Sequence, residues 1–177
     1  FILTGKFKIY TPVVVAGLFE ALKRLNQFKF IYVGSEHKDI VDLAKTYRVE
    51  DCVVSLPYQR YSESLDLIAG ADYAMMTTGM VNGTGTKIFD YLALRKPTIC
   101  FVPKGSIIKL QFDDIDQVVI QESPHTQTSI LQGLEKLLSI KSIPPGNLIQ
   151  EYSRVNASEN LANILDGITN DADEKKK

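Results

Sequence analysis

Short apolar runs alternate with longer segments of helical periodicity along this chain. The short runs are rich in β-branched and aromatic residues and are close to continuously apolar, which is typical of strands covered on both faces of a parallel sheet. The predicted strands are Phe1–Thr4, Phe28–Val33, Cys52–Ser55, Tyr73–Thr77, Thr98–Val102 and Gln117–Ile120. Their alternation with helical segments predicts βα units with helices on both faces of the sheet.

The segments between these runs carry apolar residues at helical spacing. The predicted helices are Val13–Asn26, Lys38–Tyr47, Ser62–Ala69, Thr86–Leu94, Thr126–Ser139 and Leu148–Ile168, the last after a kink or loop at Pro144–Gly146. Ser62 and Thr126 are suitable N-cap residues because their hydroxyls can accept from free N–H groups of the first turn. The pattern predicts an α/β, three-layer, Rossmann-like domain with about six parallel strands flanked by helices.

The length of 177 residues and the hydrophobic content of 45% are enough for one well-buried core. We expect residues 1–169 to form this domain. Residues 170–177 contain no apolar residue except Ala172, so they are predicted to be a flexible charged tail. Because the chain begins at Phe1 within a predicted strand and has no initiator Met, we expect it to be a piece of a longer protein.

The charge balance excludes one class of partner. The chain has 20 Lys and Arg residues against 21 Asp and Glu residues, with no basic block, so no nucleic-acid partner is expected. Cys52 and Cys100 lie in apolar stretches, where we expect buried thiols in a reducing compartment. No apolar run approaches the roughly 20 residues that span a bilayer. These features predict a cytoplasmic location.

Ligands of open parallel sheets bind at the carboxyl ends of the strands, so the loops after the strands are the first places to search. The loop after the first predicted strand reads Thr-Gly-Lys-Phe-Lys over residues 4–8. Gly5 allows a tight turn, and Lys6 and Lys8 are compact cations suited to a diphosphate. The alternative is a solvated turn with ordinary surface lysines.

A second loop, residues 77–87, is rich in glycine and threonine and leads directly into a predicted helix. Free N–H groups of a first helical turn, the helix dipole and nearby hydroxyls together attract anions, here at Gly85, Thr86 and Lys87. The glycine spacing matches neither a P-loop nor the dinucleotide-binding fingerprint. The loop therefore predicts a phosphate cradle of another kind.

Asp90 lies one helical turn beyond Thr86 and Lys87, on the same face of the predicted helix. Its carboxylate is placed to accept hydrogen bonds from ribose hydroxyls while phosphate rests at the helix start. The alternative is an acid of the first turn that only favours the helix dipole. The two histidines, His37 and His125, are far apart and lack ligand-spaced neighbours, so no metal site is predicted.

The segment Gly-Thr-Lys-Ile-Phe-Asp-Tyr-Leu-Ala-Leu-Arg-Lys-Pro, residues 85–97, resembles a motif of the group 1 glycosyltransferases. That motif has the form Thr/Ser-Lys-Leu-Phe-Glu-Tyr-Leu-Ala-x-Gly-Lys-Pro. The glycine and lysine after the first strand, Tyr32–Gly34 and residues 61–72 follow the same plan. The resemblance covers nearly the whole chain and implies the C-terminal domain of the two-domain GT-B fold. Members of this family take a sugar from a nucleotide diphosphate and usually retain its anomeric configuration.

The resemblance assigns roles to single residues around the donor. Lys6 resembles the basic residue that neutralises the donor pyrophosphate, and Thr86 and Lys87 match the helix-start positions beside the phosphates. Asp90 stands where the family usually has the glutamate that holds the ribose hydroxyls, and its reach is shorter by one methylene. Asn82 replaces a second glutamate that faces the donor sugar in many members, so an amide stands in place of a charge.

Other positions match the family less closely. The second phosphate-binding lysine of the family would fall at Pro12, so Lys8 is a displaced substitute. Arg95 stands where the motif usually has glycine, and we expect this departure to affect packing only. Backbone groups of the family meet the base after the third strand, which implies base contacts at Leu56, Pro57 and Tyr58.

The resemblance implies the donor-binding domain of a hexosyltransferase-type glycosyltransferase that uses a UDP- or GDP-sugar and needs no metal cofactor. The acceptor and catalytic groups are then expected on an N-terminal domain absent from this chain, so the chain alone should be inactive. Family habit suggests a cell-envelope polysaccharide or glycolipid acceptor and peripheral association of the full enzyme with the inner face of the membrane. The alternatives are a nucleotide-sugar epimerase domain and a non-catalytic Rossmann-like module for nucleotide binding or assembly.

Overall fold

The computed structural model describes residues 1–7, 12–25, 27–141 and 152–174. The chain divides into two compact units, Phe1–Ile143 and Pro144–Lys177, and each is described by itself.

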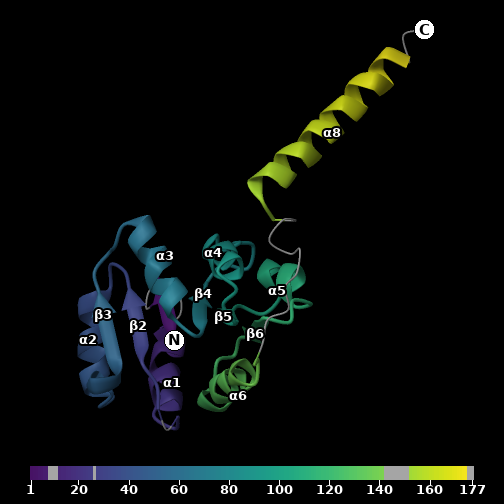
Figure 1. The fold of residues 1–177 in the computed structure, drawn as a ribbon. Coiled ribbons are helices and arrows are strands. Elements are labelled where there is room, and N and C mark those ends of the chain that lie inside the picture. The colour runs from purple at the N-terminus through teal and green to yellow at the C-terminus, as the bar shows by residue number, and fades with distance from the viewer. Residues whose placement is uncertain (8–11, 26, 142–151, 175–177) are drawn as a thin grey trace. The chain divides into compact units, whose positions relative to one another are not determined.

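The first unit is built on a six-stranded sheet in which every neighbouring pair of strands is parallel. The strands stand in the order β3-β2-β1-β4-β5-β6 (Figure 1). Their bounds are β1 Ile2–Thr4, β2 Phe30–Val33, β3 Val53–Leu56, β4 Ala74–Thr77, β5 Thr98–Val102 and β6 Val118–Glu122. All six predicted strands are present, so the predicted parallel α/β architecture is confirmed.

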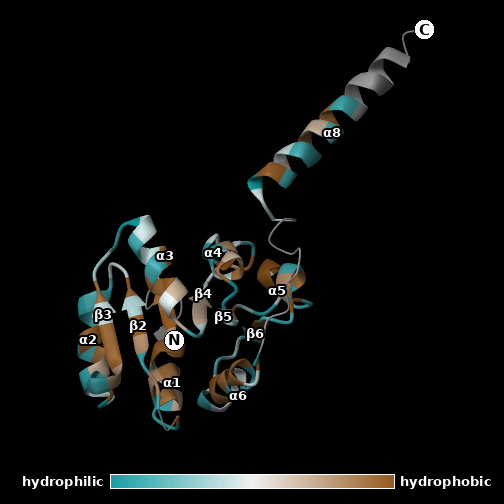
Figure 2. Ribbon diagram, viewed as in Figure 1, coloured by the Kyte–Doolittle hydropathy of each residue, from teal (hydrophilic) through white to brown (hydrophobic). Residues whose placement is uncertain are grey.

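Helices cover both faces of this sheet. They are α1 Pro12–Leu22, α2 His37–Thr46, α3 Tyr61–Gly70, α4 Lys87–Ala93, α5 Ile107–Phe112 and α6 Gln127–Leu138. Two buried clusters show which helices cover which face. One cluster joins residues of α1, α2 and α6 to Leu3 and Met75. The other joins residues of α3, α4 and α5 to Ile2 and Met76. Successive residues of a strand point to opposite faces, which gives the sheet a core on each side. Hydrophobic residues colour much of β2, β3, α1 and α6 in Figure 2.

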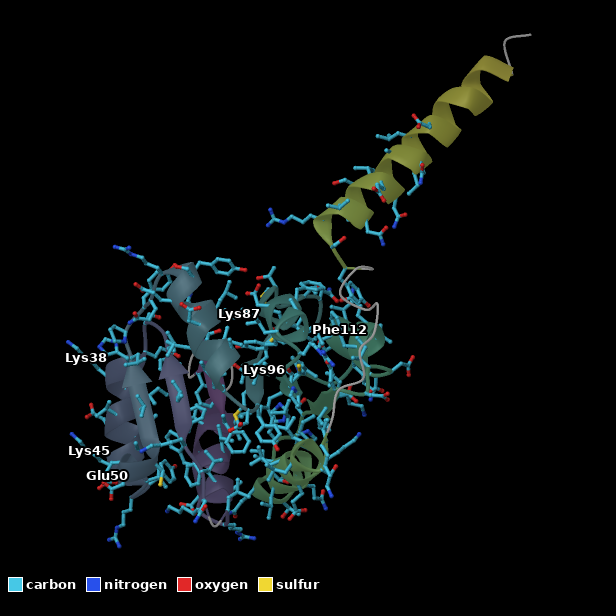
Figure 3. The ribbon with its side chains drawn as sticks, in the orientation of Figure 1. Lys38, Lys45, Glu50, Lys87, Lys96 and Phe112 are labelled. Carbon is cyan, nitrogen blue, oxygen red and sulfur yellow. The ribbon has the colours of Figure 1, made fainter. Side chains whose placement is uncertain are left out.

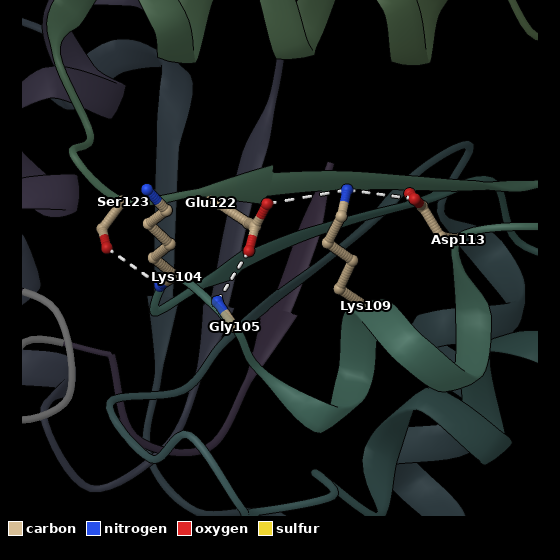
Figure 4. Close-up of polar contacts among 6 residues, drawn as sticks. All are labelled: Lys104, Gly105, Lys109, Asp113, Glu122 and Ser123. Carbon is tan, nitrogen blue, oxygen red and sulfur yellow. Dashed lines mark hydrogen bonds and ion pairs between the residues drawn. The ribbon is translucent and has the colours of Figure 1, made fainter.

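The sequence pattern missed α5 and a 3₁₀ helix, Glu50–Cys52, before β3. With six residues, α5 is too short for a clear helical period. Figure 4 shows its polar contacts: Lys109 pairs with Asp113 at the end of the helix at 3.0 Å and with Glu122 of β6 at 3.6 Å. Gly105, which precedes the helix, donates its N–H to Glu122 Oε1 at 2.8 Å. The local signal for α5 is its N-cap, Ser106, whose hydroxyl accepts from Ile108 N–H at 3.3 Å.

One of the two predicted N-caps is confirmed and the other is wrong. Thr126 caps α6, because its hydroxyl accepts from Ser129 N–H at 3.1 Å and Ser129 Oγ accepts from Thr126 N–H at 3.0 Å. Ser62 lies inside α3, and the cap position is Arg60, whose N–H donates to Glu63 at 3.0 Å. Glu63, in the first turn of α3, accepts from this N–H. The helix therefore begins at Tyr61, before the start that a hydroxyl cap at Ser62 predicts.

The cysteines differ in burial. Cys100 is fully buried on β5, and burial raises the pKa of its thiol to about 12. Cys52 is only partly buried, so the expectation of two buried thiols holds for Cys100 alone.

The second unit contains α8, Arg154–Glu174. The start of the helix predicted at Leu148 lies outside the described residues. The helix runs on past the predicted end at Ile168, so residues 170–174 of the predicted tail are helical, and residues 175–177 lie outside the described part. Over the described residues, no helix is both long enough and apolar enough to cross a bilayer.

The strand order creates a switch point between β1 and β4. From β1 the chain builds outward to β2 and β3, then returns to β4 on the other side of β1. Loops that leave β1 and β4 at their carboxyl ends therefore diverge, and a crevice opens between them, as in other doubly wound sheets. The two loops singled out from the sequence follow these two strands.

Candidate functional site

Two adjoining hollows lie at the carboxyl ends of β1 and β4. The first, of about 270 Å³, lies beside the glycine-rich loop, and its lining includes Lys6, Thr78 and Gly85. The second, of about 260 Å³, lies toward α3, and its lining includes Tyr58, Tyr61 and Asp90. Both are lined by Thr4, Thr86 and Lys87. The structure thus brings residues of the loops after β1 and β4 together at one hollow.

Lys87 is the first residue of α4 and borders both hollows (Figure 3). Its Nζ donates to the carbonyl of Thr4 at 2.7 Å. Burial lowers the pKa of Lys87 from its usual value, and the nearby Asp90 carboxylate partly opposes this effect. The crevice is therefore walled by a partly desolvated cation, whose attraction for an anion is less screened by water than that of a surface lysine.

Gly5 makes this position of the lysine possible. Its backbone has φ +94°, and a Cβ on Gly5 would collide with Nζ of Lys87. The Gly5 N–H donates to the carbonyl of Val33 at 2.7 Å, which fixes the turn against β2. Gly5 is thus required both by its conformation and by the close approach of the lysine.

Lys6 is exposed and lines the first hollow. It follows Gly5 directly and shares this hollow's lining with residues of the glycine-rich loop. Lys8, the second lysine predicted for this loop, lies outside the described residues.

The glycine-rich loop packs closely on β4 before α4 begins. A Cβ on Gly85 would lie 2.8 Å from the sulfur of Met76, so a side chain there would displace the loop or the methionine. The carbonyls of Gly85 and Thr86 accept from Ile88 and Phe89 N–H at 3.1 and 3.2 Å, which starts the helix with a tight turn. The helix that follows is short, with seven residues.

Tyr91, which sequence reasoning did not assign, locks α4 onto β1. Its hydroxyl hydrogen-bonds Thr4 Oγ1 at 2.9 Å and accepts from Thr4 N–H at 3.3 Å. Burial raises the pKa of Tyr91 to about 12, so the phenol stays protonated in this contact. The bond holds Lys87, one turn earlier on α4, beside the end of β1.

Asp90 lines the second hollow, as expected for a residue one turn inside α4. Its Oδ1 accepts from the hydroxyl of Tyr61 at 2.7 Å. Tyr61 begins α3 and is 65% exposed. It belongs to the segment that carries the family resemblance, but its contact with Asp90 depends on how α3 and α4 pack side by side, which no local pattern reveals.

The remaining residues predicted to contact the donor differ in whether they line a hollow. Tyr58 lines the second hollow and is 81% exposed, whereas Leu56 and Pro57 are not among the residues that line it. Leu56 instead accepts from Gly34 N–H at 3.0 Å through its carbonyl. Asn82 is exposed in its loop and is not among the residues that line either hollow.

Arg95 corrects one expectation. It has φ +53°, and the N–H groups of Arg95 and Lys96 donate to the carbonyls of Leu92 and Tyr91, both at 2.9 Å. This is the left-handed end of α4, where glycine is favoured because it carries no Cβ. The replacement of the motif's glycine therefore affects the backbone conformation and not packing alone.

No family model matches this sequence, and no curated protein matches it. Solved structures match in fold. HepE from Anabaena, solved with UDP and glucose, has a TM-score of 0.67 and 17% identity over 94% of this chain and 48% of its own. WaaG, a glycosyltransferase involved in lipopolysaccharide biosynthesis, has a TM-score of 0.61 and 17% identity over 78% of this chain and 38% of its own. This chain thus spans less than half the length of either protein.

A third structure is itself a single domain. It is the C-terminal domain of LpcC, a group 1 family glycosyltransferase from Francisella tularensis, with a TM-score of 0.54 and 14% identity over 78% of this chain and 73% of its own. At these identities the likeness concerns the fold. The chain has the fold of the C-terminal domain of a group 1 glycosyltransferase of the GT-B type.

Proposed function

We propose that this chain is the donor-binding domain of a glycosyltransferase that moves a sugar from a nucleotide diphosphate sugar to an acceptor with retention. The observation that carries the proposal is the position of Lys87, a partly buried cation that borders both hollows at the switch point of the sheet. Ligands of doubly wound sheets bind at this point.

The two hollows suit different parts of one ligand. Lys6, Gly85, Thr86 and Lys87 offer cations, a hydroxyl and backbone N–H groups to a diphosphate in the first hollow. Such groups stabilise the negative charge that develops on the departing diphosphate, and they act more strongly where water is excluded. In this proposal the protein's own cations carry out this task without a metal cofactor.

In the second hollow, Asp90 accepts from ribose hydroxyls and Tyr58 borders the base. Asn82 is proposed to approach the donor sugar from the glycine-rich loop. UDP is the first ligand to test, because HepE was solved with UDP and glucose, and GDP is the second.

The acceptor and the catalytic groups belong, in this proposal, to an N-terminal domain outside this chain. A cell-envelope polysaccharide or glycolipid acceptor is supported by WaaG, which is involved in lipopolysaccharide biosynthesis. Such an acceptor suggests that the full enzyme works in the cytoplasm at the inner face of the membrane.

Calorimetric titration of the chain with UDP, GDP and ADP tests the proposal. Saturable binding of UDP or GDP is expected, with weaker binding of the matching nucleoside because it lacks the diphosphate. A chain that binds none of the three nucleotides is an assembly module, and the proposed function is then wrong.

A further inference from the structure

Glu36 is a buried carboxylate beneath the loop that follows β1. It lies between β2 and α2 and is only 8% exposed. Burial of an acid is costly unless hydrogen bonds compensate it. The donor contacts proposed above do not use Glu36, so its burial calls for another reason.

One hydrogen-bond partner of Glu36 comes from a different βα unit. Its Oε2 accepts from the backbone N–H of Phe7 at 2.6 Å, in a buried contact between residues 29 positions apart. Hydrogen bonds to an ionised acceptor are shorter and stronger than neutral ones. The contact fixes the backbone directly after Lys6.

Tyr32 fixes the backbone directly before Lys6. Its hydroxyl donates to the carbonyl of Gly5 and accepts from Glu36 N–H at 3.2 Å. Burial raises the pKa of Tyr32 to about 12, so the phenol keeps the proton that it donates. Tyr32 and Glu36 thus hold the two peptide groups that flank one exposed lysine.

Close packing around Gly5 and Phe7 limits where the backbone of Lys6 can lie. The side chain of Phe7 is fully buried, with its ring centroid 6.2 Å from that of Phe30. A Cβ on Gly34 would collide with the Gly5 carbonyl and with the Tyr32 hydroxyl. The turn after β2 therefore has to be glycine for the loop of Lys6 to lie where it does.

We propose that Glu36 is a positioning residue that sets Lys6 at the first hollow, through the N–H of Phe7 and together with Tyr32. This inference rests on the proposed function, in which Lys6 binds the donor diphosphate. Charge alone predicts the opposite effect of Glu36, because a carboxylate near the site repels a diphosphate. The direction of the change in affinity therefore separates positioning from simple electrostatics.

The test compares UDP and uridine binding by calorimetry in wild type, Glu36→Ala, Glu36→Gln, Lys6→Ala and the Glu36→Ala/Lys6→Ala double variant. Glu36→Ala is expected to weaken UDP binding by about tenfold, the order of magnitude for a charged hydrogen bond that is lost or misplaced. Uridine binding should change little. Glu36→Gln keeps an acceptor for Phe7 N–H and should stay within about twofold of wild type.

The double variant shows whether Glu36 acts through Lys6. In the Lys6→Ala background, Glu36→Ala should change UDP binding by less than about twofold, because coupled residues are not additive. Tyr32→Phe, which removes the hydroxyl that donates to the Gly5 carbonyl and accepts from Glu36 N–H, should weaken UDP binding to a smaller extent. It keeps the inference testable if Glu36→Ala does not fold.

Three outcomes would overturn the inference. The first is unchanged or tighter UDP binding in Glu36→Ala, and the second is an equal loss of affinity for UDP and for uridine in that variant. The third is that Glu36→Ala weakens UDP binding as much in the Lys6→Ala background as in wild type. If Lys6→Ala weakens UDP binding and Glu36→Ala does not, only the positioning role is wrong. If Lys6→Ala itself leaves UDP binding unchanged, the assignment of Lys6 to the diphosphate fails, and the positioning role fails with it.

Discussion

The amine of Lys87 lies directly over the backbone of Gly5, in the space that a Cβ on Gly5 would occupy. It donates there to the carbonyl of Thr4 at 2.7 Å. The end of β1 and the start of α4 are therefore joined by one cation, which faces the crevice at the switch point.

Lys87→Ala should weaken nucleoside diphosphate binding by about 1–3 kcal/mol, as loss of a charged hydrogen bond does, and change nucleoside binding little. Calorimetry with UDP and uridine measures both. Lys96→Ala is a matched control, because Lys96 also donates to backbone carbonyls, those of Ala69 and Ala71 at 2.6 and 2.7 Å, but it lies just before β5, at the end of the sheet opposite to the crevice. Equal losses for UDP and uridine would show that Lys87 acts on folding instead.

Gly5→Ala should destabilise the fold by about 1–3 kcal/mol through its positive φ and also weaken diphosphate binding by displacing Lys87. Gly105→Ala separates the two effects, because Gly105 also has a positive φ, +74°, but nothing lies within 4 Å of its added Cβ. That control should lose stability and keep its affinity. Denaturant unfolding and UDP titration are the measurements, and unchanged affinity in Gly5→Ala would contradict the prediction.

Asp90→Ala should weaken UDP binding by about 1–3 kcal/mol, since both ribose hydrogen bonds are lost, whereas Asp90→Asn should be mild because it keeps an acceptor. A 2′,3′-dideoxy nucleotide is the decisive ligand. Wild type should bind it more weakly than the parent nucleotide, and Asp90→Ala should scarcely distinguish the two. An alanine variant that discriminates as strongly as wild type would leave Asp90 as a partner of Tyr61 only.

Arg95→Gly should stabilise the chain by roughly 0.5–1 kcal/mol, because glycine adopts the left-handed end of α4 without a Cβ penalty. Arg48 has φ +56° just after α2 and provides an independent comparison in Arg48→Gly. Thermal or denaturant unfolding measures the change. A lower stability of Arg95→Gly would mean that the arginine side chain makes contacts worth more than the backbone strain.

The affinity for UDP should fall as the pH is raised through the alkaline range, and it should fall at a lower pH than an ordinary lysine with a pKa of about 10.4 would cause. Burial lowers the pKa of Lys87, and only its protonated form attracts the diphosphate. The effect on folding has the opposite sign, because the unfolded chain then binds more protons and stability rises with pH. Calorimetry across this range checks the prediction. Lys87→Ala is the control, because its affinity should change with pH only through the titration of UDP itself. Parallel curves of UDP affinity against pH for wild type and Lys87→Ala would rule out Lys87 as the group whose titration changes the affinity.

Local patterns in the sequence were sufficient to determine the parallel α/β architecture. Continuous apolar runs identify strands covered on both faces, and the short polar sequence around Thr126 identifies a helix start, because both signals depend on neighbours a few positions away. The loop at Gly85–Lys87 and the turn at Gly5 could be predicted for the same reason. The short helix α5 was not predicted, because its six residues give no clear helical period and its cap, Ser106, is a single residue of local signal.

Only the tertiary structure decided which side chains meet. Tyr61 reaches Asp90, and Glu36 reaches Phe7, across 29 positions in each case. Such contacts arise because the strand order places β1 between β2 and β4, with β3 beside β2, and the segments that follow these parallel strands all lie at their carboxyl ends. The strand order depends on how whole βα units pack, and the spacing of residues within one unit carries no record of it.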